Sequence, residues 1–247
     1  MTIIIPMAGL SSRFTKAGYT LPKYMLYVKD KSLFNLAVSS FSNYFETCRF
    51  VFVVRNVFDT PRFVNEECVL LGIKDYEVVM LANPTRGQAE TVLKGIEGAG
   101  IAPEESILIF NIDTFRLGYT FPDKIDEWDG YLETFVGTGD NWSYAKTEDG
   151  TPESCVVETA EKRPISQYCS TGMYYFRHAA DFLGVYDKEC AAPTAKELYV
   201  APLYNYLIKQ GKDIHISVIP REAVLFCGVP KEYEEYLKEH ILLNEES

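Results

Sequence analysis

The chain has 247 residues, of which 47% are hydrophobic and 24% charged, and its formal net charge is −11. This length and composition predict one compact globular domain with a sizeable core. No stretch concentrates Lys or Arg into a face that could neutralise a row of phosphates, so nucleic acid is excluded as an expected partner. The N-terminal apolar run lacks the basic region of a signal peptide, and nowhere do about 18 uncharged apolar residues occur together, so we expect no membrane span and a cytoplasmic location.

The cysteines are scattered, without a C-x-x-C pair or the usual spacing of metal ligands. This distribution argues against a zinc site and against a dense disulfide framework, and it favours reduced, mostly buried thiols. The six are Cys48, Cys68, Cys155, Cys169, Cys190 and Cys227.

The first half of the chain alternates apolar runs with segments of helical spacing. Residues 2–6 form a β-branched run that predicts a buried strand, and after a long loop a helix begins behind Ser32 as N-cap. The pattern then predicts a strand, a helix and a strand over residues 49–55, 60–73 and 76–81.

The alternation continues with a helix at 87–100, whose face of Ala89, Val92, Leu93 and Ile96 is apolar, and with a strand that ends at Asp113. Strands separated by single helices imply right-handed crossovers and a mostly parallel sheet, with a ligand crevice at the carboxyl ends of the strands. The expected fold class is therefore α/β, a Rossmann-like three-layer sandwich.

Beyond Gly130 the pattern changes to short alternating segments between turn residues, which predicts antiparallel strands added to the sheet. A helix interrupted by Pro202 is expected over 195–212, followed by a strand at 213–220 and an amphipathic helix at 229–243. The apolar stripe of that last helix indicates packing within the chain, or a contact in a homo-oligomer. Its members are Tyr233, Tyr236, Leu237 and Ile241.

The segment GLSSRF follows the first strand, and the segment LPKYML comes next, with Lys23 ten residues after Arg13. Small residues after a buried strand let backbone N–H groups face a ligand, while Arg13 adds a forked cation suited to phosphate. Pro22 stiffens the loop before Lys23, which offers a point charge. Taken alone, the stretch also fits an ordinary Gly/Ser turn with a solvated arginine and lysine.

Together these segments resemble the signature of the nucleotidyltransferases that make sugar nucleotides from nucleoside triphosphates, a Gly-rich loop with Ser/Thr-Arg, a spacer, and Pro-Lys. The resemblance implies the GT-A-like fold of that family. It also implies that Lys23 neutralises charge at the reacting phosphate, and that the triphosphate is held by Ala8, Gly9, Leu10, Ser11, Ser12 and Arg13. Ser11 stands where the family usually has a second glycine.

The resemblance continues in order along the chain. TRGQAET is similar to the family's segment that contacts the nucleobase, which implies that Gly87 and Gln88 read the base, although a helix start with solvated polar residues explains Gln88 equally well. NID resembles the segment of the metal-binding aspartate, and Asp113 at a strand's carboxyl end can grip Mg²⁺ shared with phosphates.

The acceptor side is implied by AEKRPISQYCSTG. Its resemblance to the family's Glu-Lys segment and Thr-Gly strand places Glu161, Thr171 and Gly172 on the acceptor and Lys162 near its phosphate. Near the end, LFCGVP resembles the segment in which an aspartate commonly supplies a second metal ligand, but this chain has Phe226 at that position.

We therefore expect a single domain over 1–247, in which 1–115 binds a nucleoside triphosphate and 116–247 binds a phosphorylated small-molecule acceptor. The expected reaction is NTP + sugar 1-phosphate → NDP-sugar + pyrophosphate, magnesium-dependent and serving capsule or surface polysaccharide. An alternative is the activation of a phosphorylated alcohol such as phosphocholine with CTP. Two alternatives of another class are a nucleotide-sugar-dependent glycosyltransferase, which would normally want a D-x-D motif, and a non-catalytic nucleotide-binding protein.

Overall fold

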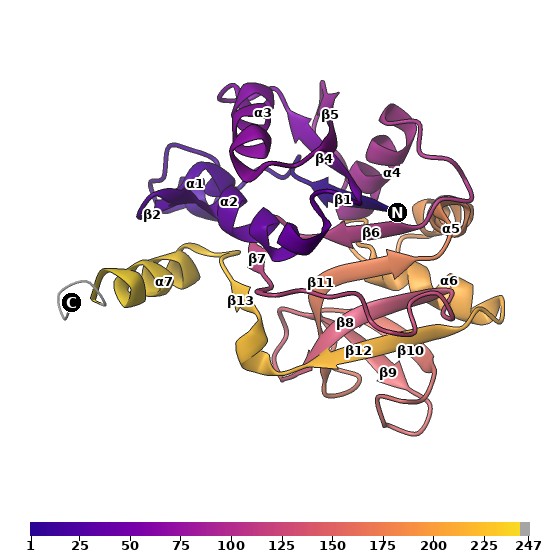
Figure 1. The fold of residues 1–247 in the computed structure, drawn as a ribbon. Helices are drawn as coiled ribbons and strands as arrows, with labels where there is room; N and C mark the ends of the chain where they lie inside the picture. The colour runs from indigo at the N-terminus through magenta and orange to yellow at the C-terminus, as the bar shows by residue number, and fades with distance from the viewer. Residues whose placement is uncertain (243–247) are drawn as a thin grey trace.

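A nine-stranded mixed sheet runs through the centre of the molecule and includes strands from both halves of the sequence (Figure 1). The computed structural model describes residues 1–242, and side chains up to residue 239. Along the sheet the strands lie in the order β10-β9-β11-β6-β1-β4-β5, while β8 pairs with β11, and β12 pairs with β8.

Four strands from the first half of the chain are parallel to one another, as predicted. They are β1 (Thr2–Pro6), β4 (Arg49–Arg55), β5 (Asp75–Leu81) and β6 (Ile107–Phe110). On β1, Ile3 and Ile5 lie in one hydrophobic cluster and Ile4 lies in the other. Because both faces of β1 are covered, the run Ile3, Ile4 and Ile5 is apolar at consecutive positions rather than at alternate ones.

Helices cover both faces of this part of the sheet (Figure 1). The cluster that contains Ile3 includes buried side chains of α2 (Leu33–Val38) and α3 (Thr60–Leu71). The cluster that contains Ile4 includes those of α4 (Gln88–Gly98), α5 (Ala179–Ala191) and α6 (Tyr204–Lys209). The predicted N-cap is present, since the Ser32 hydroxyl accepts a hydrogen bond from the Asn35 amide at 2.9 Å.

The second half of the chain adds strands on the far side of β6. They are β8 (Gly130–Val136), β9 (Ser143–Thr147), β10 (Val156–Glu161), β11 (Tyr168–Phe176) and β12 (Ile214–Ile219). Strand β11 joins β6 in the antiparallel sense, and β8 and β9 pair with β11 in the same sense. The predicted antiparallel addition is therefore present, whereas β12 runs parallel to β8.

Short elements surround the ends of these strands. They are α1 (Ser12–Lys16), the hairpin β2 (Tyr27–Val28) with β3 (Lys31–Ser32), the pair β7 (Thr114–Phe115) with β13 (Leu225–Phe226), and the 3₁₀ turns Lys23–Met25, Ser39–Tyr44, Ala201–Leu203 and Arg221–Ala223. The stretch predicted as a long loop after β1 thus contains a short helix and a 3₁₀ turn.

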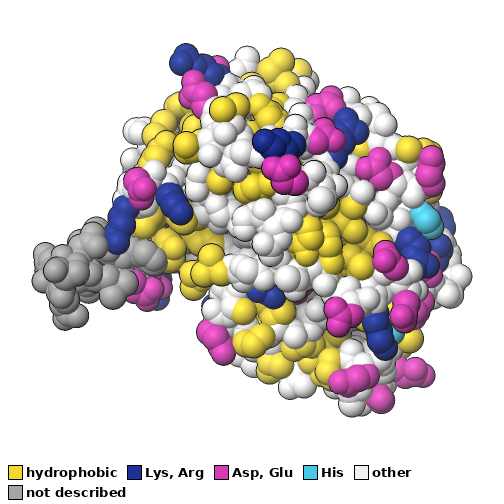
Figure 2. Space-filling model, in the orientation of Figure 1, with side chains coloured by type: hydrophobic (Ala, Val, Ile, Leu, Met, Phe, Trp, Pro, Cys, Tyr) yellow, Lys and Arg dark blue, Asp and Glu magenta, His cyan; other side chains and the backbone are white. Residues whose placement is uncertain are grey.

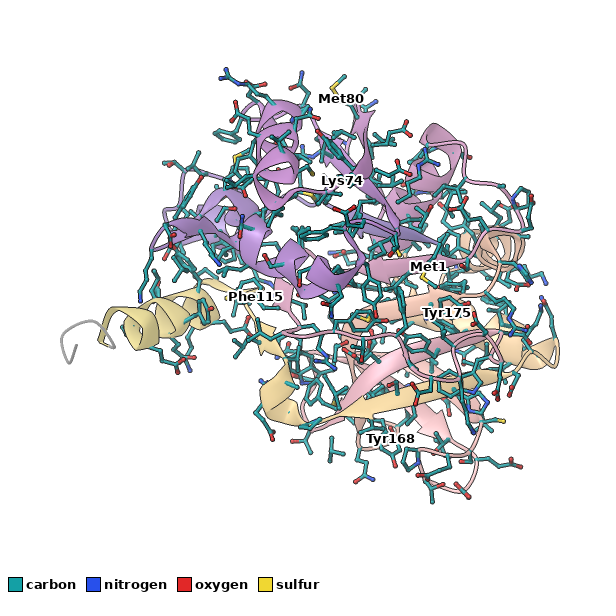
Figure 3. The ribbon with its side chains drawn as sticks, viewed as in Figure 1. Met1, Lys74, Met80, Phe115, Tyr168 and Tyr175 are labelled. Carbon is teal, nitrogen blue, oxygen red and sulfur yellow. The ribbon has the colours of Figure 1, made fainter. Side chains whose placement is uncertain are left out.

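The last helix, α7 (Pro230–Leu242), packs against the rest of the chain through its apolar stripe. Tyr233 is buried, and its hydroxyl donates to the Tyr27 carbonyl at 2.8 Å. Figure 3 shows Phe115 beside α7, and its ring centroid lies 5.5 Å from that of Tyr236. The side chain of Ile241, predicted for the same stripe, lies outside the described residues.

Two parts of the sequence-based assignment are wrong. Residues 195–200 are not helical, because the Leu198 backbone accepts from the Ala89 amide at 2.8 Å and donates to the Arg86 carbonyl at 3.1 Å, so this stretch pairs with the start of α4. Helix α5 was not anticipated. Its N-cap is His178, whose side chain makes no capping bond, so the usual Ser, Thr or Asp signal for a helix start is missing.

Figure 2 shows acidic and basic side chains interspersed over the face that it presents, without a gathering of cations there. Among the helices within residues 1–242, none combines the length and the apolar character that a membrane crossing needs.

Candidate active site

A cleft of about 780 Å³ lies beyond the carboxyl ends of β1 and β6. A volume of this size is typical of a small-molecule site. All fourteen residues predicted for nucleotide, metal or acceptor line it, namely Ala8, Gly9, Leu10, Ser11, Ser12, Arg13, Lys23, Gly87, Gln88, Asp113, Glu161, Lys162, Thr171 and Gly172.

Ser11 has a left-handed backbone conformation, with φ 50° and ψ 30°. Its carbonyl accepts hydrogen bonds from the Phe14 and Thr15 amides at 2.9 and 3.1 Å, which starts helix α1. A non-glycine residue adopts this conformation at a cost of roughly 1–2 kcal/mol. The turn therefore keeps the shape that a glycine adopts most easily, and the serine does not redirect it.

The loop is anchored at its start and open further on. The Met7 amide donates to the Val53 carbonyl at 2.8 Å, and Arg55 Nε donates to the Ala8 carbonyl at 2.9 Å. Gly9 and Arg13 are exposed to solvent, and the Arg13 guanidinium makes no hydrogen bond or ion pair within residues 1–242. This leaves a forked cation beside backbone amides, an arrangement suited to phosphate.

Lys23 Nζ and Asp113 Oδ2 form an ion pair in the cleft. Lys23 is held by the 3₁₀ turn that follows Pro22, and Asp113 follows β6. Their side chains are 21% and 22% exposed, so neither is fully removed from solvent. The pair joins the segment after Pro22 to the carboxyl end of the central sheet.

A second carboxylate borders Asp113. The Asp113 carbonyl accepts from the Cys227 amide at 2.8 Å, and a Cβ atom at Gly228 would lie 3.1 Å from Asp113 Oδ2 and 3.7 Å from Glu232 Oε2. Glu232 Oε2 also accepts from the Gly228 and Val229 amides at 2.8 and 3.1 Å. Carboxylate oxygens are the donors that Mg²⁺ prefers, so the residues present fit this ion.

Sequence reasoning missed Glu232, although a signal for it exists. With Pro230 as the first residue of α7, Glu232 occupies the third helical position, where a glutamate characteristically turns back to the amides that precede the helix.

Gln88 and Asn111 join the segment that was expected to contact the base to the segment that was expected to bind the metal. Gln88 Nε2 donates to Asn111 Oδ1 at 2.5 Å. Gly172 closes the other side of Asn111, because a Cβ at Gly172 would lie 2.2 Å from Asn111 Nδ2. Gly87 is needed for a similar reason, since a Cβ there would lie 2.5 Å from the Leu198 carbonyl oxygen. Both glycines permit close approaches that fix the side chains around them.

Glu161 is the last residue of β10, and Lys162, which follows it, contacts Tyr199. The Glu161 side chain is 9% exposed and accepts a hydrogen bond from the Ser143 hydroxyl. Burial raises the pKa of Glu161, although Ser143 and Lys162 act in the opposite direction. Burial lowers the pKa of Lys162, but a 2.6 Å hydrogen bond to the Tyr199 hydroxyl and the Glu161 charge outweigh it, so the net pKa is raised.

A crystal structure of the nucleoside-diphosphate-sugar pyrophosphorylase from Vibrio cholerae superposes on this fold with a TM-score of 0.91. The two chains are 51% identical over 96% of this chain and 99% of the other. This chain belongs to the sugar-nucleotide-forming nucleotidyltransferases. The resemblance seen in the sequence is thereby confirmed, and the protein is an enzyme of the pyrophosphorylase type.

Other nucleotidyltransferase structures share the fold at low identity. A UDP-glucose pyrophosphorylase with UDP-glucose matches at a TM-score of 0.74 and 15% identity, covering 97% of this chain and 98% of that one. An inositol-1-phosphate CTP transferase from T. maritima matches at 0.69 and 14%, covering 97% and 95%. These matches confirm the predicted fold class. No family model matches the chain. No curated protein sequence matches it.

Membership of the nucleotidyltransferase family argues against two of the functions that the sequence left open, a glycosyltransferase and a non-catalytic binding protein.

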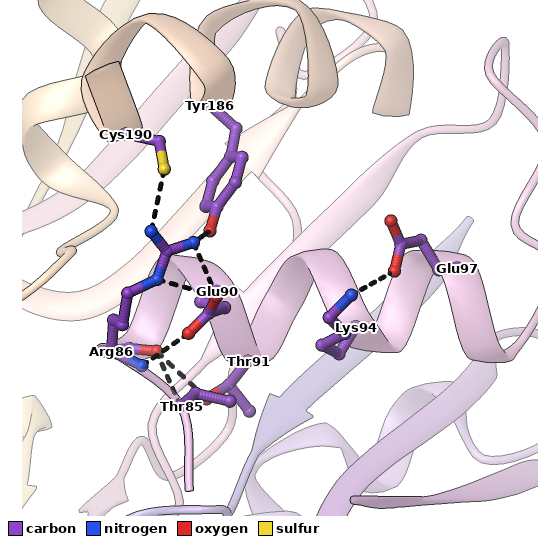
Figure 4. Close-up of polar contacts among 9 residues, drawn as sticks. Thr85, Arg86, Glu90, Thr91, Lys94, Glu97, Tyr186 and Cys190 are labelled. Atoms are coloured by element: carbon purple, nitrogen blue, oxygen red, sulfur yellow. Dashed lines mark hydrogen bonds and ion pairs between the residues drawn. The ribbon is translucent and has the colours of Figure 1, made fainter. Parts of the chain in front are cut away.

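In this nucleotidyltransferase, Arg86 fixes the turn that leads into α4 (Figure 4). Its guanidinium contacts the Glu90 carboxylate at 2.6 Å, the Tyr186 hydroxyl at 3.0 Å and Cys190 Sγ at 3.0 Å. Because Arg86 is adjacent to Gly87, α5 thereby holds the segment predicted to face the base.

Thr171 lines the cleft, but its hydroxyl donates to Glu133 Oε1 at 3.2 Å. Glu133 is buried and also accepts from Arg116 Nε at 3.1 Å. Burial raises the pKa of Glu133, although Arg116 acts in the opposite direction. The Thr171 hydroxyl is therefore part of a buried polar network below the cleft.

Phe226, which stands where the family commonly has an aspartate, belongs to an aromatic surface. Its ring centroid lies 4.6 Å from that of Trp142, and both residues line the cleft. The Arg221 guanidinium also contacts this ring, at 5.1 Å from the Phe226 ring centroid. In this enzyme an apolar wall therefore occupies the position of that carboxylate.

Proposed function

We propose that this nucleotidyltransferase joins a nucleoside triphosphate to a sugar 1-phosphate and releases pyrophosphate, in the cytoplasm and for capsule or surface polysaccharide. The observation that carries the proposal is the convergence of the predicted phosphate loop, the Lys23–Asp113 pair and the Glu161–Lys162 pair in one cleft. The 51% identity to a nucleoside-diphosphate-sugar pyrophosphorylase supports the same reaction type.

We assign the two substrates to the two halves of the domain. Residues 1–115 supply the open loop with Arg13, together with Gln88 and Lys23, and bind the nucleotide. Residues 116–247 supply Glu161, Lys162 and Gly172, and bind the acceptor. The Glu161 side chain is buried, which suits a hydrogen bond from an acceptor hydroxyl. A hydrogen bond to a buried carboxylate stabilises the complex more than one to a carboxylate in water.

The reaction proceeds by in-line attack. An oxygen of the acceptor phosphate forms a bond to the α-phosphorus, and the bond from that phosphorus to the oxygen that bridges to the β-phosphate breaks. Pyrophosphate leaves with the electron pair. The acceptor phosphate is already ionised, so no protein nucleophile is needed, and catalysis consists of positioning and charge neutralisation.

Three cations divide this work. Arg13 binds the triphosphate with its forked donor set, and Lys23 exchanges its partner Asp113 for the phosphate at which charge develops. Lys162, held by the Tyr199 hydroxyl, orients the incoming phosphate. Asp113, with Glu232 beside it, would hold Mg²⁺. When bound, this ion would neutralise charge on the triphosphate and on the departing pyrophosphate.

A second acceptor, a phosphorylated amino alcohol such as phosphocholine activated with CTP, is favoured by the aromatic surface of the cleft. The rings of Trp142, Phe226 and Tyr199 line the same cleft as the carboxylates of Glu161 and Glu197. Aromatic faces and a carboxylate are the groups that bind a quaternary ammonium.

Pyrophosphate release tests both candidates. The purified enzyme with Mg²⁺ is assayed with CTP, UTP, dTTP, GTP and ATP, each combined with a hexose 1-phosphate or with phosphocholine. We expect one nucleotide and one acceptor class to dominate, and the same nucleotide to raise the melting temperature. The proposal fails if no pair releases pyrophosphate and no nucleotide shifts the melting temperature, or if Asp113→Asn retains the wild-type rate.

A further inference from the structure

Three side chains of metal-ligand type meet at a place remote from the cleft. Cys155 immediately precedes β10, and Asp213 and His215 lie at the start of β12. The cleft residue Glu161 ends β10, which puts it about 20 Å away along an extended strand at about 3.3 Å per residue. Asp113, the expected magnesium ligand, lines the cleft, and none of the three residues of this cluster does.

The distances between the three donor atoms are those of ligands around one ion. Cys155 Sγ lies 3.4 Å from Asp213 Oδ1 and 3.9 Å from His215 Nε2, and the latter two atoms are 2.8 Å apart. Zinc bonds of about 2.0–2.3 Å in a tetrahedron separate neighbouring ligand atoms by roughly 3.3–3.6 Å. The three distances bracket this range, so shifts of about half an ångström would place all three donors on one ion.

The surroundings orient the donors. Trp128 stacks on the His215 ring with centroids 4.8 Å apart and an interplanar angle of 19°. Asp213 is fixed through its backbone, because its amide donates to Asp129 Oδ2 at 2.9 Å and its carbonyl accepts from the Asp129 amide at 2.9 Å. The Asp213 carboxylate lies 3.4 Å from the Cys155 sulfur, so the cluster offers negative charge and suits a cation.

The geometry does not fit a catalytic triad. In a Cys-His-Asp relay the nucleophile and the carboxylate contact different nitrogens of the imidazole ring. Here Cys155 Sγ and Asp213 Oδ1 both approach His215 Nε2. Binding of an ion explains this convergence on one point better than proton transfer does.

We propose that Cys155, Asp213 and His215 bind one divalent transition-metal ion of the zinc type, with water completing the shell. One thiolate, one imidazole and one carboxylate make a mixed donor set that suits Zn²⁺ and is poor for Mg²⁺. The spacing rule that argued against a zinc site fails here because the ligands come from two strands that are distant in the sequence.

The ion would join two edge strands. Within residues 1–242, β10 pairs with β9 and β12 pairs with β8, and no hydrogen-bonded ladder joins β10 to β12. The two strands nevertheless contact each other, and Figure 1 shows them side by side. A metal bridge where the two strands begin would fix this contact without backbone pairing.

Cobalt spectroscopy on the full chain tests the proposal. EDTA-treated, reduced protein is titrated with Co²⁺, and we expect a near-ultraviolet thiolate-to-cobalt absorption band that saturates at one ion per chain and is removed by Zn²⁺. Cys155→Ser should abolish the band. His215→Ala and Asp213→Asn should retain it with an affinity at least about tenfold lower, as for other disrupted metal sites.

Two control variants should keep the band at full affinity. Cys190→Ser removes the other thiol that is not fully buried, and Asp113→Asn removes the expected magnesium ligand, which carries no thiolate. The proposal is overturned if the wild-type protein shows no band below millimolar Co²⁺, if the band survives in Cys155→Ser, or if His215→Ala and Asp213→Asn both bind as wild type does. Circular dichroism checks that Cys155→Ser is folded, and if it is not, the other two variants decide.

Discussion

Lys23 and Asp113 neutralise each other across the cleft, although they are 90 residues apart in the sequence. One of them was expected to bind phosphate and the other a metal ion. Each residue must therefore release the other when its own ligand binds. We expect the magnesium ion and the nucleotide to bind cooperatively, because a lysine that has moved to a phosphate leaves Asp113 available to the metal.

Replacing Lys23 by Ala should lower kcat by roughly 10²–10³-fold, the usual loss when one preorganised charge-stabilising group is removed. A pyrophosphate-release assay measures the change. Lys16→Ala is the matched control, since Lys16 is an exposed lysine of α1 that does not line the cleft. Equal rates for the two variants would contradict the role given to Lys23.

Replacing Ser11 by Gly should leave the enzyme as stable as wild type or stabilise it by up to about 1 kcal/mol, because relief of the left-handed conformation exceeds the extra freedom of glycine in the unfolded chain. Ser11→Val should destabilise it by about 1–2 kcal/mol. Urea unfolding measures both. Ser12→Gly, in the first turn of α1, should destabilise, and a gain there equal to that of Ser11→Gly would refute the explanation.

Gly172→Ala should destabilise the fold by at least about 2 kcal/mol, since overpacking adds to a backbone with φ of 91°. The new Cβ would collide with the Asn111 side chain, so activity should fall as well. Gly184→Ala offers a control within α5, where a Cβ meets nothing within 4 Å, and we expect it to stabilise by about 0.5–1 kcal/mol. Thermal unfolding should therefore show a lower melting temperature for Gly172→Ala and a higher one for Gly184→Ala.

Glu161→Gln should separate stability from activity. The raised pKa of Glu161 means that the folded chain holds the proton more tightly than the unfolded chain. The free energy of unfolding therefore falls as the pH rises from the ordinary glutamate pKa of about 4.3 through the raised pKa of the folded chain. Above this window the variant should be at least as stable as wild type, and the difference should vanish below it. Its KM for the acceptor should rise. Urea titrations at several pH values test the sign, which would be wrong if the variant were less stable at neutral pH.

The sequence was most informative where one periodicity or one cap determined an element. The run at Ile3, Ile4 and Ile5 predicted a strand buried on both faces, and Ser32 predicted the start of α2. It failed at Leu198, where hydrogen bonds to the start of α4 replace the helix that the composition favours.

For the cleft, local motifs identified the residues that carry charge, but not their neighbours. Asp113 follows a recognisable strand, whereas Glu232 reaches it only because β13 pairs with β7. Cys155 and His215 show the same limit, because no spacing rule relates residues that meet only through sheet topology. Contacts between distant segments are set by the fold, which local patterns do not specify.

The pairing of β7 with β13 has a consequence for how the enzyme folds. It closes a loop of roughly 110 residues around Asp113, and long loops form late because their closure costs entropy before any contact repays it. The pairing of the parallel strands β1, β4, β5 and β6 with one another involves no residue beyond Phe110. During refolding, the sheet should therefore appear first, and the capacity to bind magnesium nucleotide should return in a slower phase.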